Sequence, residues 1–301
     1  MSPQIAVFTK NKTNPAYEAA RLGADRVARQ FGAVTRHYVP DRPDNVEEQI
    51  ALIGRAIAEQ PDAAVFVPVH ETRVNGAILD FEANGIPLFN FIAPTTIGRR
   101  VCFVGSEDRA LATNIARYLF SKLSGRGTIV ILEGTPASAT SHERLKGFND
   151  ALGDNPGIVV RASLRGEYQR DVTRDVISSS GDKLHNADAF LCANDAMALG
   201  VLDVIGASAS QPLVVGVNAI PEAIEAIASG RMLATANFDA MAMSAIATEA
   251  ALRHLRGEAV PPEIMLPVQV IDAANCARWN VPFDARACPS WQEVTSQSGA
   301  A

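Results

Sequence analysis

The stretch Leu191–Gly200, LCANDAMALG, contains the transition from which the fold can be worked out. The apolar run Ala187–Ala193 stops at an Asn-Asp pair, and a segment of helical composition follows at once. A strand that leads directly into a helix is the repeating unit of α/β folds. Asn194 and Asp195 stand where that strand would end. Such a pair can be catalytic, hold a metal, grip a ligand or cap the helix.

The same pattern extends along the chain in both directions from this stretch. Short apolar runs alternate with amphipathic segments, and the runs are continuous rather than alternating, which is typical of strands buried on both faces. The predicted strands are Ile5–Thr9, Ala63–Val69, Pro87–Ile92, Thr128–Leu132, Gly157–Leu164, Ala187–Ala193 and Leu213–Val217.

Helical spacing fills the intervals between these runs. Apolar residues in 17–31 recur at i, i+3 and i+7, with Gly32 placed for the C-terminal cap. A second segment starts at Val46 behind Asn45 and Glu48, an arrangement that resembles a capping box. The alternation predicts an α/β fold of parallel sheets with helices on both faces. Two sheets accommodate nine or so strands better than one, and the break between them is predicted near 100–106.

Composition excludes several classes of function. The chain has 301 residues, a net charge of −6 and a pI of about 5.4, so no nucleic-acid partner is expected. No apolar run approaches the roughly 18 residues of a membrane helix. The start MSPQIAVF leads straight into a strand, which leaves two alternatives: a cytosolic protein, or one whose leader has been removed.

The four cysteines show neither CxxC nor zinc-site spacing. Cys102 and Cys192 lie inside apolar runs and are predicted to be buried, inert thiols. Cys276 and Cys288 lie in the irregular C-terminal segment, where a disulfide in an oxidising compartment stays an open hypothesis.

Asparagine recurs where the predicted strands stop. The five are Asn14, Asn90, Asn194, Asn218 and Asn237. Ligands of open α/β sheets bind at the carboxyl ends of the strands. An amide carries one acceptor and two donors, which suits a hydroxyl that both gives and accepts a hydrogen bond. One such asparagine is usually a turn or cap residue, but five together predict a binding edge for a polar, uncharged, polyhydroxylated small molecule.

Other side chains at these ends fit the same interpretation. Arg144 adds a forked donor, and the aromatic rings of Tyr168 and Phe238 offer faces to C–H groups. Asn194 is predicted to bind the ligand. Asp195 is predicted to be a first-turn acid that faces the helix dipole and orients its neighbour.

Signatures of enzymes are largely missing. The sequence has no GxGxxG after a strand, no GxxxxGK[ST], no GxSxG and no HExxH. Ser141, His142 and Glu143 are adjacent in sequence and cannot form a catalytic relay. The histidines lack metal spacing. The prediction is a binding protein without catalytic residues, metal or cofactor.

The chain resembles the type 1 periplasmic binding proteins, specifically the ribose-binding-protein-like sugar receptors of ABC transporters. The resemblance covers roughly residues 4–275, with its motifs in family order. The motifs are NPAY (14–17), IPLFNF (86–91), HERLKGF (142–148), CANDAMALG (192–200), LVVGVNAIPEAIEAIASGRMLAT (213–235) and LRGEAVPPEIMLPVQVI (255–271).

The resemblance implies two doubly wound lobes joined by a three-stranded hinge, with the ligand held between the lobes when they close. It implies a monomer in the periplasm that hands a sugar or polyol to a membrane permease. The hinge crossings are expected near 103–105, 236–239 and 264–268. The expected lobes are 1–104 with 238–266 and 105–237 with 267–285, followed by a tail at 286–301.

Carried over by position, five residues match the family's ligand contacts. They are Asn14, the stacking aromatic Tyr17, Arg144, Tyr168 and Asn194.

Five other positions depart from the family pattern, and one of them is Ala16 in place of an aromatic. Asn90 and Asn218 stand where these receptors usually have Asp, and Phe91 replaces an Arg. Phe238, with Asn237 beside it, stands where a Gln is common. The departures predict a ligand other than ribose: another pentose or hexose, a deoxy or branched sugar, a polyol, or a molecule with a weakly acidic group that Asp would repel.

Two other functions remain as alternatives. The effector-binding domain of a LacI-type regulator shares this fold, but it follows a DNA-binding segment of roughly 60 residues, whereas the first strand here begins at about residue 4. An α/β enzyme such as a dehydrogenase would need a phosphate-binding fingerprint, which the sequence lacks.

Overall fold

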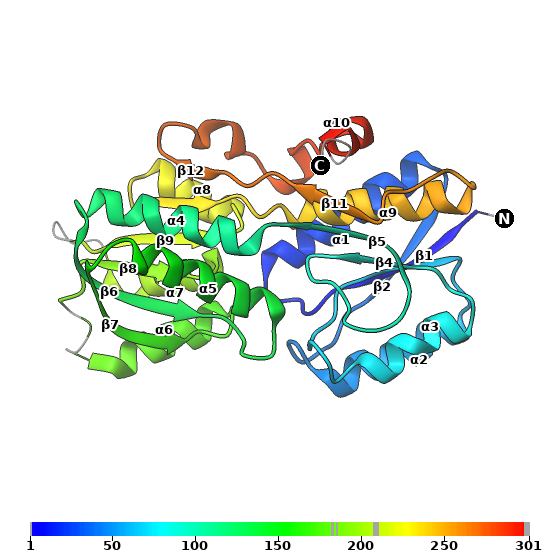
Figure 1. The fold of residues 1–301 in the computed structure, drawn as a ribbon, viewed down its shortest axis with the longest axis horizontal. Helices are drawn as coiled ribbons and strands as arrows, with labels where there is room; N and C mark the ends of the chain where they lie inside the picture. Colours follow the sequence, from blue (N-terminus) through cyan, green and yellow to red (C-terminus); the bar gives the residue numbers. More distant parts are fainter. Residues whose placement is uncertain (1, 182–183, 185, 207–210, 298–301) are drawn as a thin grey trace. The chain divides into compact units, whose positions relative to one another are not determined.

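The computed structural model describes residues 2–181, 184, 186–206 and 211–297, and the chain divides into two compact units (Figure 1). Unit 1 consists of Met1–Ser106, Asp239–Pro267 and Phe283–Ala301. Unit 2 consists of Glu107–Phe238 and Val268–Pro282. The chain therefore passes between the units at 106/107, 238/239, 267/268 and 282/283. The last of these passages was not among the crossings that the resemblance implies.

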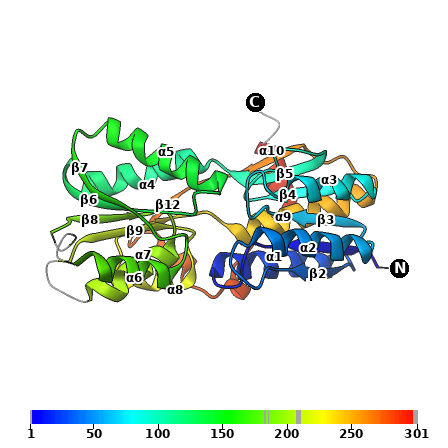
Figure 2. The same cartoon turned by 90° about the horizontal axis from the view of Figure 1, so that it is seen from below.

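Unit 1 is built on a parallel sheet in the order β11-β5-β4-β3-β1-β2. The strands are β1 (Gln4–Phe8), β2 (Val34–Tyr38), β3 (Ala63–Phe66), β4 (Leu88–Phe91), β5 (Arg100–Ser106) and β11 (Glu263–Leu266). Four helices pack on it: α1 (Pro15–Gln30), α2 (Val46–Ala58), α3 (Asn75–Ala83) and α9 (Ala240–Leu255). Helices α1 and α9 pack together on one face, and α2 and α3 on the other (Figures 1 and 2).

Unit 2 is built on a second sheet in the order β12-β10-β9-β8-β6-β7. The strands are β6 (Arg126–Glu133), β7 (Gly157–Arg165), β8 (Ala189–Cys192), β9 (Leu213–Val217), β10 (Ala234–Ala236) and β12 (Val270–Asp272). Helices α4 (Asp108–Lys122) and α5 (Ala139–Gly153) cover one face. The other face carries α6 (Arg170–Ser180), α7 (Asp195–Ile205) and α8 (Pro221–Ala228) (Figure 2).

The C-terminal part of the chain adds short elements. These are the 3₁₀ turns η2 (Cys276–Trp279) and η3 (Phe283–Ala285) and the helix α10 (Trp291–Gln297). Residues 283–301, partly assigned from the sequence to a separate tail, belong to unit 1 in this division. Arg26 of α1 binds this segment by donating to the main-chain oxygens of Asp284 and Arg286, at 2.8 and 2.6 Å.

The predicted α/β fold class is confirmed, but two details of the sheets were predicted wrongly. Strand β12 runs antiparallel to β10, so the second sheet is not wholly parallel. The run Gly157–Leu164 lies in β7, an edge strand, and is not buried on both faces, since Val159 is 58% exposed. A continuous apolar run is therefore no proof of a central strand. Strand β2, VTRHY, was missed because an edge strand with polar side chains has no apolar run.

The helix ends show how the sequence positions the start of each helix. Asn45 caps α2 by accepting from the main-chain nitrogen of Glu48 at 2.9 Å. The carboxylate of Glu48 does not complete the capping box, because it accepts from the main-chain nitrogens of Asp41 and Arg42 instead. The turn before the helix is thereby fixed as well.

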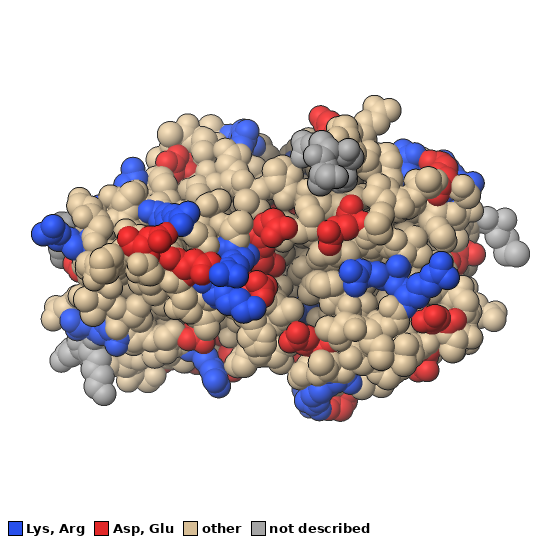
Figure 3. All heavy atoms as spheres, viewed as in Figure 1, with Lys and Arg blue, Asp and Glu red and all other residues tan. Residues whose placement is uncertain are grey.

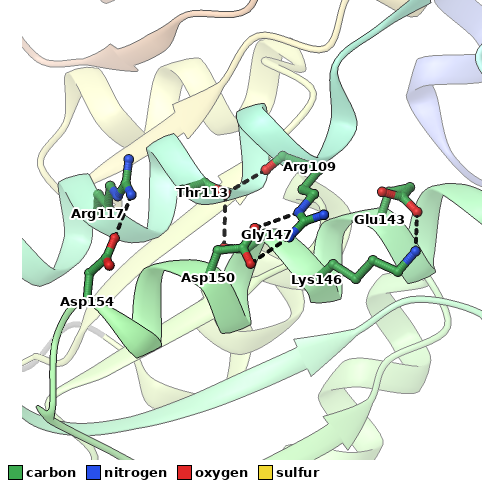
Figure 4. Close-up of polar contacts among 8 residues, drawn as sticks. All are labelled: Arg109, Thr113, Arg117, Glu143, Lys146, Gly147, Asp150 and Asp154. Carbon is green, nitrogen blue, oxygen red and sulfur yellow. Dashed lines mark hydrogen bonds and ion pairs between the residues drawn. The ribbon is translucent and has the colours of Figure 1, made fainter.

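Helices α4 and α5 pack closely enough to fix the side chains that leave them (Figure 4). A Cβ at Gly147 would lie 2.3 Å from the main-chain oxygen of Arg109, so only glycine permits this approach. Thr113 donates to the main-chain oxygens of Arg109 and Gly147 at 2.8 and 3.1 Å, and Arg109 binds both carboxylate oxygens of Asp150. The first residue of α4, Asp108, is thus held in a fixed place beside α5.

Exposed ion pairs continue along the same two helices. Arg117 pairs with Asp154 at 2.5 Å, and Lys146 pairs with Glu143 at 2.6 Å. Basic and acidic side chains lie intermixed on this surface of unit 2 (Figure 3). Exposed ion pairs contribute about 0–1 kcal/mol each to stability. The close packing at Gly147 therefore contributes more than these charges to holding α4 against α5. None of the helices in the described part of the chain has the length and apolarity to cross a bilayer.

Candidate ligand-binding site

Arg144 is the centre of a buried polar cluster at the carboxyl edge of the unit 2 sheet. The residue is 2% exposed. Its Nε donates to Oδ1 of Asp108 at 2.8 Å, and its Nη1 donates to the main-chain oxygen of Ala193 at 2.6 Å. The guanidinium carbon lies 4.5 Å from the ring centroid of Phe238 and 5.9 Å from that of Tyr168. The structure therefore brings together Arg144, Tyr168 and Phe238, as the sequence predicted for this edge.

Tyr168 is held at this edge by an unusual backbone. Tyr168 and Glu167 both have positive φ, 61° and 52°, which non-glycine residues rarely adopt. The ring of Tyr168 lies against Gly134, in the loop after β6, where a Cβ would lie 2.1 Å from Cζ. A side chain at residue 134 would therefore displace the ring. Strained backbone that is fixed by its surroundings is frequent at ligand sites.

Asn194 serves as the N-cap of α7 and also joins the cluster. Its Oδ1 accepts from the main-chain nitrogen of Met197 at 2.9 Å, and its Nδ2 donates to the main-chain oxygen of Tyr168 at 3.2 Å. Asn194 therefore both caps α7 and lies at the binding edge.

Asp195 lies in the first turn of α7, as the sequence predicts, but its carboxylate also has partners that the sequence did not show. The carboxylate does not simply face the helix dipole. It accepts from Oγ1 of Thr235 on β10 at 2.6 Å and from the main-chain nitrogen of Ile220 at 3.0 Å. Burial raises the pKa of Asp195 to about 6, although these hydrogen bonds oppose the shift. Asp195 therefore ties α7 to β10 and to the loop after β9.

The loop after β9 presents Asn218 in a strained corner. Asn218 and Ala219 have φ of 126° and 56°. The main-chain nitrogen of Asn218 donates to the oxygen of Ala236 at 2.9 Å. The carboxylate of Asp195 accepts from the main-chain nitrogen of Ile220, two residues after Asn218. The position of the Asn218 amide therefore depends on a residue remote in sequence.

Asn237 follows β10 directly. Its main-chain nitrogen donates to the oxygen of Gln269 at 2.7 Å. Its Oδ1 is buried and has no hydrogen-bond partner in the part of the chain that the structure describes. A buried acceptor of this kind is costly unless a ligand or a water satisfies it.

The carboxyl edge of the unit 1 sheet carries Asn14 and Tyr17. Asn14 is the N-cap of α1: its Oδ1 accepts from the main-chain nitrogen of Ala16 at 3.0 Å. The main-chain nitrogen of Asn14 donates to Oδ1 of Asn11 at 2.9 Å. Tyr17 is buried in the first turn of the helix. Both residues are positioned by the loop that follows β1.

Asn90 and Phe91 occupy the end of β4, at the same edge. Asn90 is fully buried, with Nδ2 donating to the main-chain oxygen of Phe66 at 3.1 Å and Oδ1 accepting from Oγ1 of Thr95 at 3.0 Å. Phe91 is fully buried and pairs in the sheet with Val104 of β5.

Several residues of these edges escaped sequence reasoning. Lys10, 5% exposed, and Asn11 lie in the loop after β1 and are buried. Their position just after a strand is a signal, visible in the sequence, that they lie at the binding edge. Because they stand beside Lys12, however, the segment has the composition of a solvated loop. Asp108 gave no signal, because its partner Arg144 lies 36 residues away.

All four cysteines are free thiols, including the suggested pair Cys276 and Cys288. Burial raises the pKa of Cys102 to about 12 and that of Cys288 to about 11, so neither thiol is activated as a nucleophile.

Comparisons with known proteins identify the relatives of this chain. The family model described as periplasmic binding protein domain matches residues 5–259. The ribose import binding protein of Haemophilus influenzae is 25% identical over 271 residues, which cover 89% of this chain and 90% of that protein. A solute-binding protein of Actinobacillus succinogenes, solved with bound D-allose, is 26% identical to this chain and superposes on it with a TM-score of 0.85. The superposition covers 91% of this chain and 99% of that protein. The myo-inositol binding protein of Caulobacter shares the fold at a TM-score of 0.82 and 24% identity, covering 91% of this chain and 94% of its own.

Proposed function

Since the chain belongs to the periplasmic binding protein domain family, the non-enzymatic solute-binding proteins of ABC transporters, we propose that it captures a small polyhydroxylated molecule, a sugar or a sugar derivative. The residues proposed to contact it lie at the carboxyl edges of the two sheets. They are Asn14, Tyr17, Asn90, Phe91, Arg144, Tyr168, Asn194, Asn218, Asn237 and Phe238. That one solute contacts both units stays a prediction from the sequence.

The buried cluster around Arg144 is the observation that carries this proposal. A guanidinium held by Asp108 and by a main-chain oxygen, with aromatic rings at 4.5 and 5.9 Å, combines directional donors with apolar faces. Sugars present hydroxyls at their edges and C–H groups on their faces, so such a set of groups suits them.

The surroundings of Asn90 support a ligand other than ribose. Its Nδ2 donates to the oxygen of Phe66. An aspartate at this position would place a carboxylate oxygen against that carbonyl. The neighbourhood therefore fits an amide, and Asn90 offers a ligand no carboxylate at the position where ribose receptors usually have one.

Delivery and location follow from the relatives. Proteins named for ribose import and a D-allose-binding periplasmic protein of Escherichia coli are 24–25% identical to this chain. They support a periplasmic protein that passes its solute to an ABC transporter permease, and we propose that it does so as a monomer.

A melting screen with carbohydrates tests the proposal. A bound ligand at 100 times its Kd should stabilise the fold by about 2.7 kcal/mol. Arg144→Ala should abolish most of this shift, whereas Arg117→Ala, which removes an exposed pair on the same unit, should retain it. An unchanged shift in Arg144→Ala would exclude Arg144 from the site. Tight binding of plain ribose alone would refute the prediction of another ligand.

A further inference from the structure

The loop after β9 holds two successive residues at positive φ. Asn218 has a φ of 126° and Ala219 one of 56°. Residues other than glycine rarely adopt such values, and they persist only where the surrounding structure fixes them. The main-chain nitrogen of Asn218 donates to the oxygen of Ala236, which fixes the start of this corner. The conformation of the next two residues depends on other groups.

Asp195 and Thr235 hold the rest of the corner. Oγ1 of Thr235 accepts from the main-chain nitrogen of Ala219 at 3.4 Å and donates to Oδ1 of Asp195 at 2.6 Å. Oδ2 of Asp195 accepts from the main-chain nitrogen of Ile220 at 3.0 Å. The N–H groups of residues 218–220 are therefore all hydrogen-bonded, and two of them depend on the pair formed by Asp195 and Thr235.

The surroundings of this pair leave its carboxylate little freedom to move. Asp195 and Thr235 are both fully buried, so water does not compete for their hydrogen bonds. A Cβ at Gly216 would lie 2.4 Å from Oδ1 of Asp195, so only glycine lets the carboxylate approach β9 this closely. Hydrogen bonds to an ionised group are also stronger than those between neutral groups. The pair is therefore a rigid support for the corner.

The corner carries Asn218, one of the residues proposed to contact the solute. The direction of a side chain depends on the φ and ψ of its own residue. A change in the backbone of the corner would therefore turn the Asn218 amide. Because a hydrogen bond weakens steeply as its angle departs from linearity, even a small turn would weaken the bond of this amide to a hydroxyl.

We infer that Asp195 and Thr235 are positioning residues of the binding site. Neither contacts the solute; together they fix the backbone of residues 218–220, so that the amide of Asn218 is aimed at a solute hydroxyl. The inference rests on the proposed function and adds to it two residues that act through Asn218.

A double-mutant cycle tests the inference, with Kd measured by titration calorimetry. The probe is whichever of D-ribose, D-allose and myo-inositol raises the Tm of the wild type most. Asp195→Asn keeps the size of the side chain but has one acceptor oxygen, so it cannot accept from both Ile220 and Thr235. It should raise the Kd at least tenfold. In the Asn218→Gly background it should raise the Kd less than twofold, because the amide that it positions is absent and glycine adopts positive φ without strain.

The cycle separates positioning from a general loss of structure. A residue that acts through Asn218 gives losses that are not additive with Asn218→Gly, whereas an unrelated structural effect gives the same loss in both backgrounds. Equal losses in the two backgrounds would overturn the inference and leave the proposed function standing. An unchanged Kd in Asn218→Gly alone would do the same, since the amide would then have no part in binding.

A pair of valine variants gives a second test that leaves every charge in place. Thr235→Val removes the hydroxyl that joins Ala219 to Asp195, and it should raise the Kd at least fivefold. Thr248→Val removes a hydroxyl that is equally buried and donates to the main-chain oxygen of Ser244 at 2.7 Å within α9. It should change the Kd less than twofold.

Similar values of Kd for the two valine variants would overturn the inference. If the wild type bound none of the three probes and none of a wider panel of neutral sugars and polyols, the proposed function and the inference would both be overturned.

Discussion

The two units carry polar side chains at equivalent edges of their sheets, but these side chains are held in different ways. In unit 1 most of these contacts join neighbours in the sequence: Asn14 binds Asn11 and Ala16, and Asn90 binds Thr95. The exception is Nδ2 of Asn90, which donates to the main-chain oxygen of Phe66, 24 residues away. The turn after β1 is therefore sufficient to orient Asn14, whereas Asn90 also depends on the neighbouring strand β3.

In unit 2 the corresponding contacts join residues far apart in the chain. Arg144 binds Asp108 and Ala193, 36 and 49 residues away, and Asp195 binds Thr235, 40 residues away. Such contacts exist only when the whole sheet and its helices have formed. The binding edge of unit 1 is thus set mainly by local sequence, and that of unit 2 mainly by tertiary structure.

The largest effect is expected where unit 2 buries a charge pair. Asp108→Ala would leave the Arg144 guanidinium buried without its carboxylate, and breaking a buried pair in this way costs about 3–5 kcal/mol. Urea unfolding should show this loss. Arg117→Ala on the same helix breaks an exposed pair and should cost under about 1 kcal/mol. Similar losses for the two variants would show that the tertiary contact of Arg144 with Asp108 contributes no more stability than an exposed ion pair.

The next effect depends on pH and comes from Asp195. Its pKa is raised from 3.8 to about 6 by burial, so the folded state holds the proton more tightly than the unfolded state. The stability contributed by this group is therefore complete below about pH 4 and is lost as pH rises through 6, by about 3 kcal/mol in all.

Urea unfolding of the wild type and of Asp195→Asn between pH 4 and pH 7 measures this loss. The difference between the two proteins isolates the group, because the other titrating residues are common to both. A difference that does not change with pH would show that Asp195 is not the source.

The smallest effect is expected at the edge of unit 1. Asn14→Ala removes the cap of α1 and should cost about 1 kcal/mol. Asn45→Ala removes the equivalent cap of α2 and should cost about the same. The two variants should differ in ligand binding, because only Asn14 is proposed to contact the solute. Equal melting shifts with ligand would place Asn14 outside the site.

This contrast also explains what the sequence could and could not predict. The α/β fold and the end of α1 before Gly32 depend on local spacing and on residues with special backbone preferences. The antiparallel β12 could not be predicted in this way, because strand direction depends on where the chain returns.

The roles of individual residues were predictable to a similar degree. Asn194 was recognised from its place at a strand end, and its part in ligand binding stays a prediction. The carboxylate of Asp195 was assigned to the helix dipole, because its true partners, Thr235 and Ile220, are distant in sequence. The role of Asp108 could not be predicted, because nothing near it in the sequence indicates that it has a buried partner.

The interleaving of the two units determines the order in which they can form during synthesis. Most of the unit 2 sheet is encoded in one continuous stretch, Glu107–Phe238, with only β12 added later. Unit 1 begins first but lacks α9, which packs on α1, and the edge strand β11 until residue 266 has been made. The sheet of unit 1 is therefore completed only after most of unit 2 has been made, and β5 keeps an unpaired edge until β11 is added.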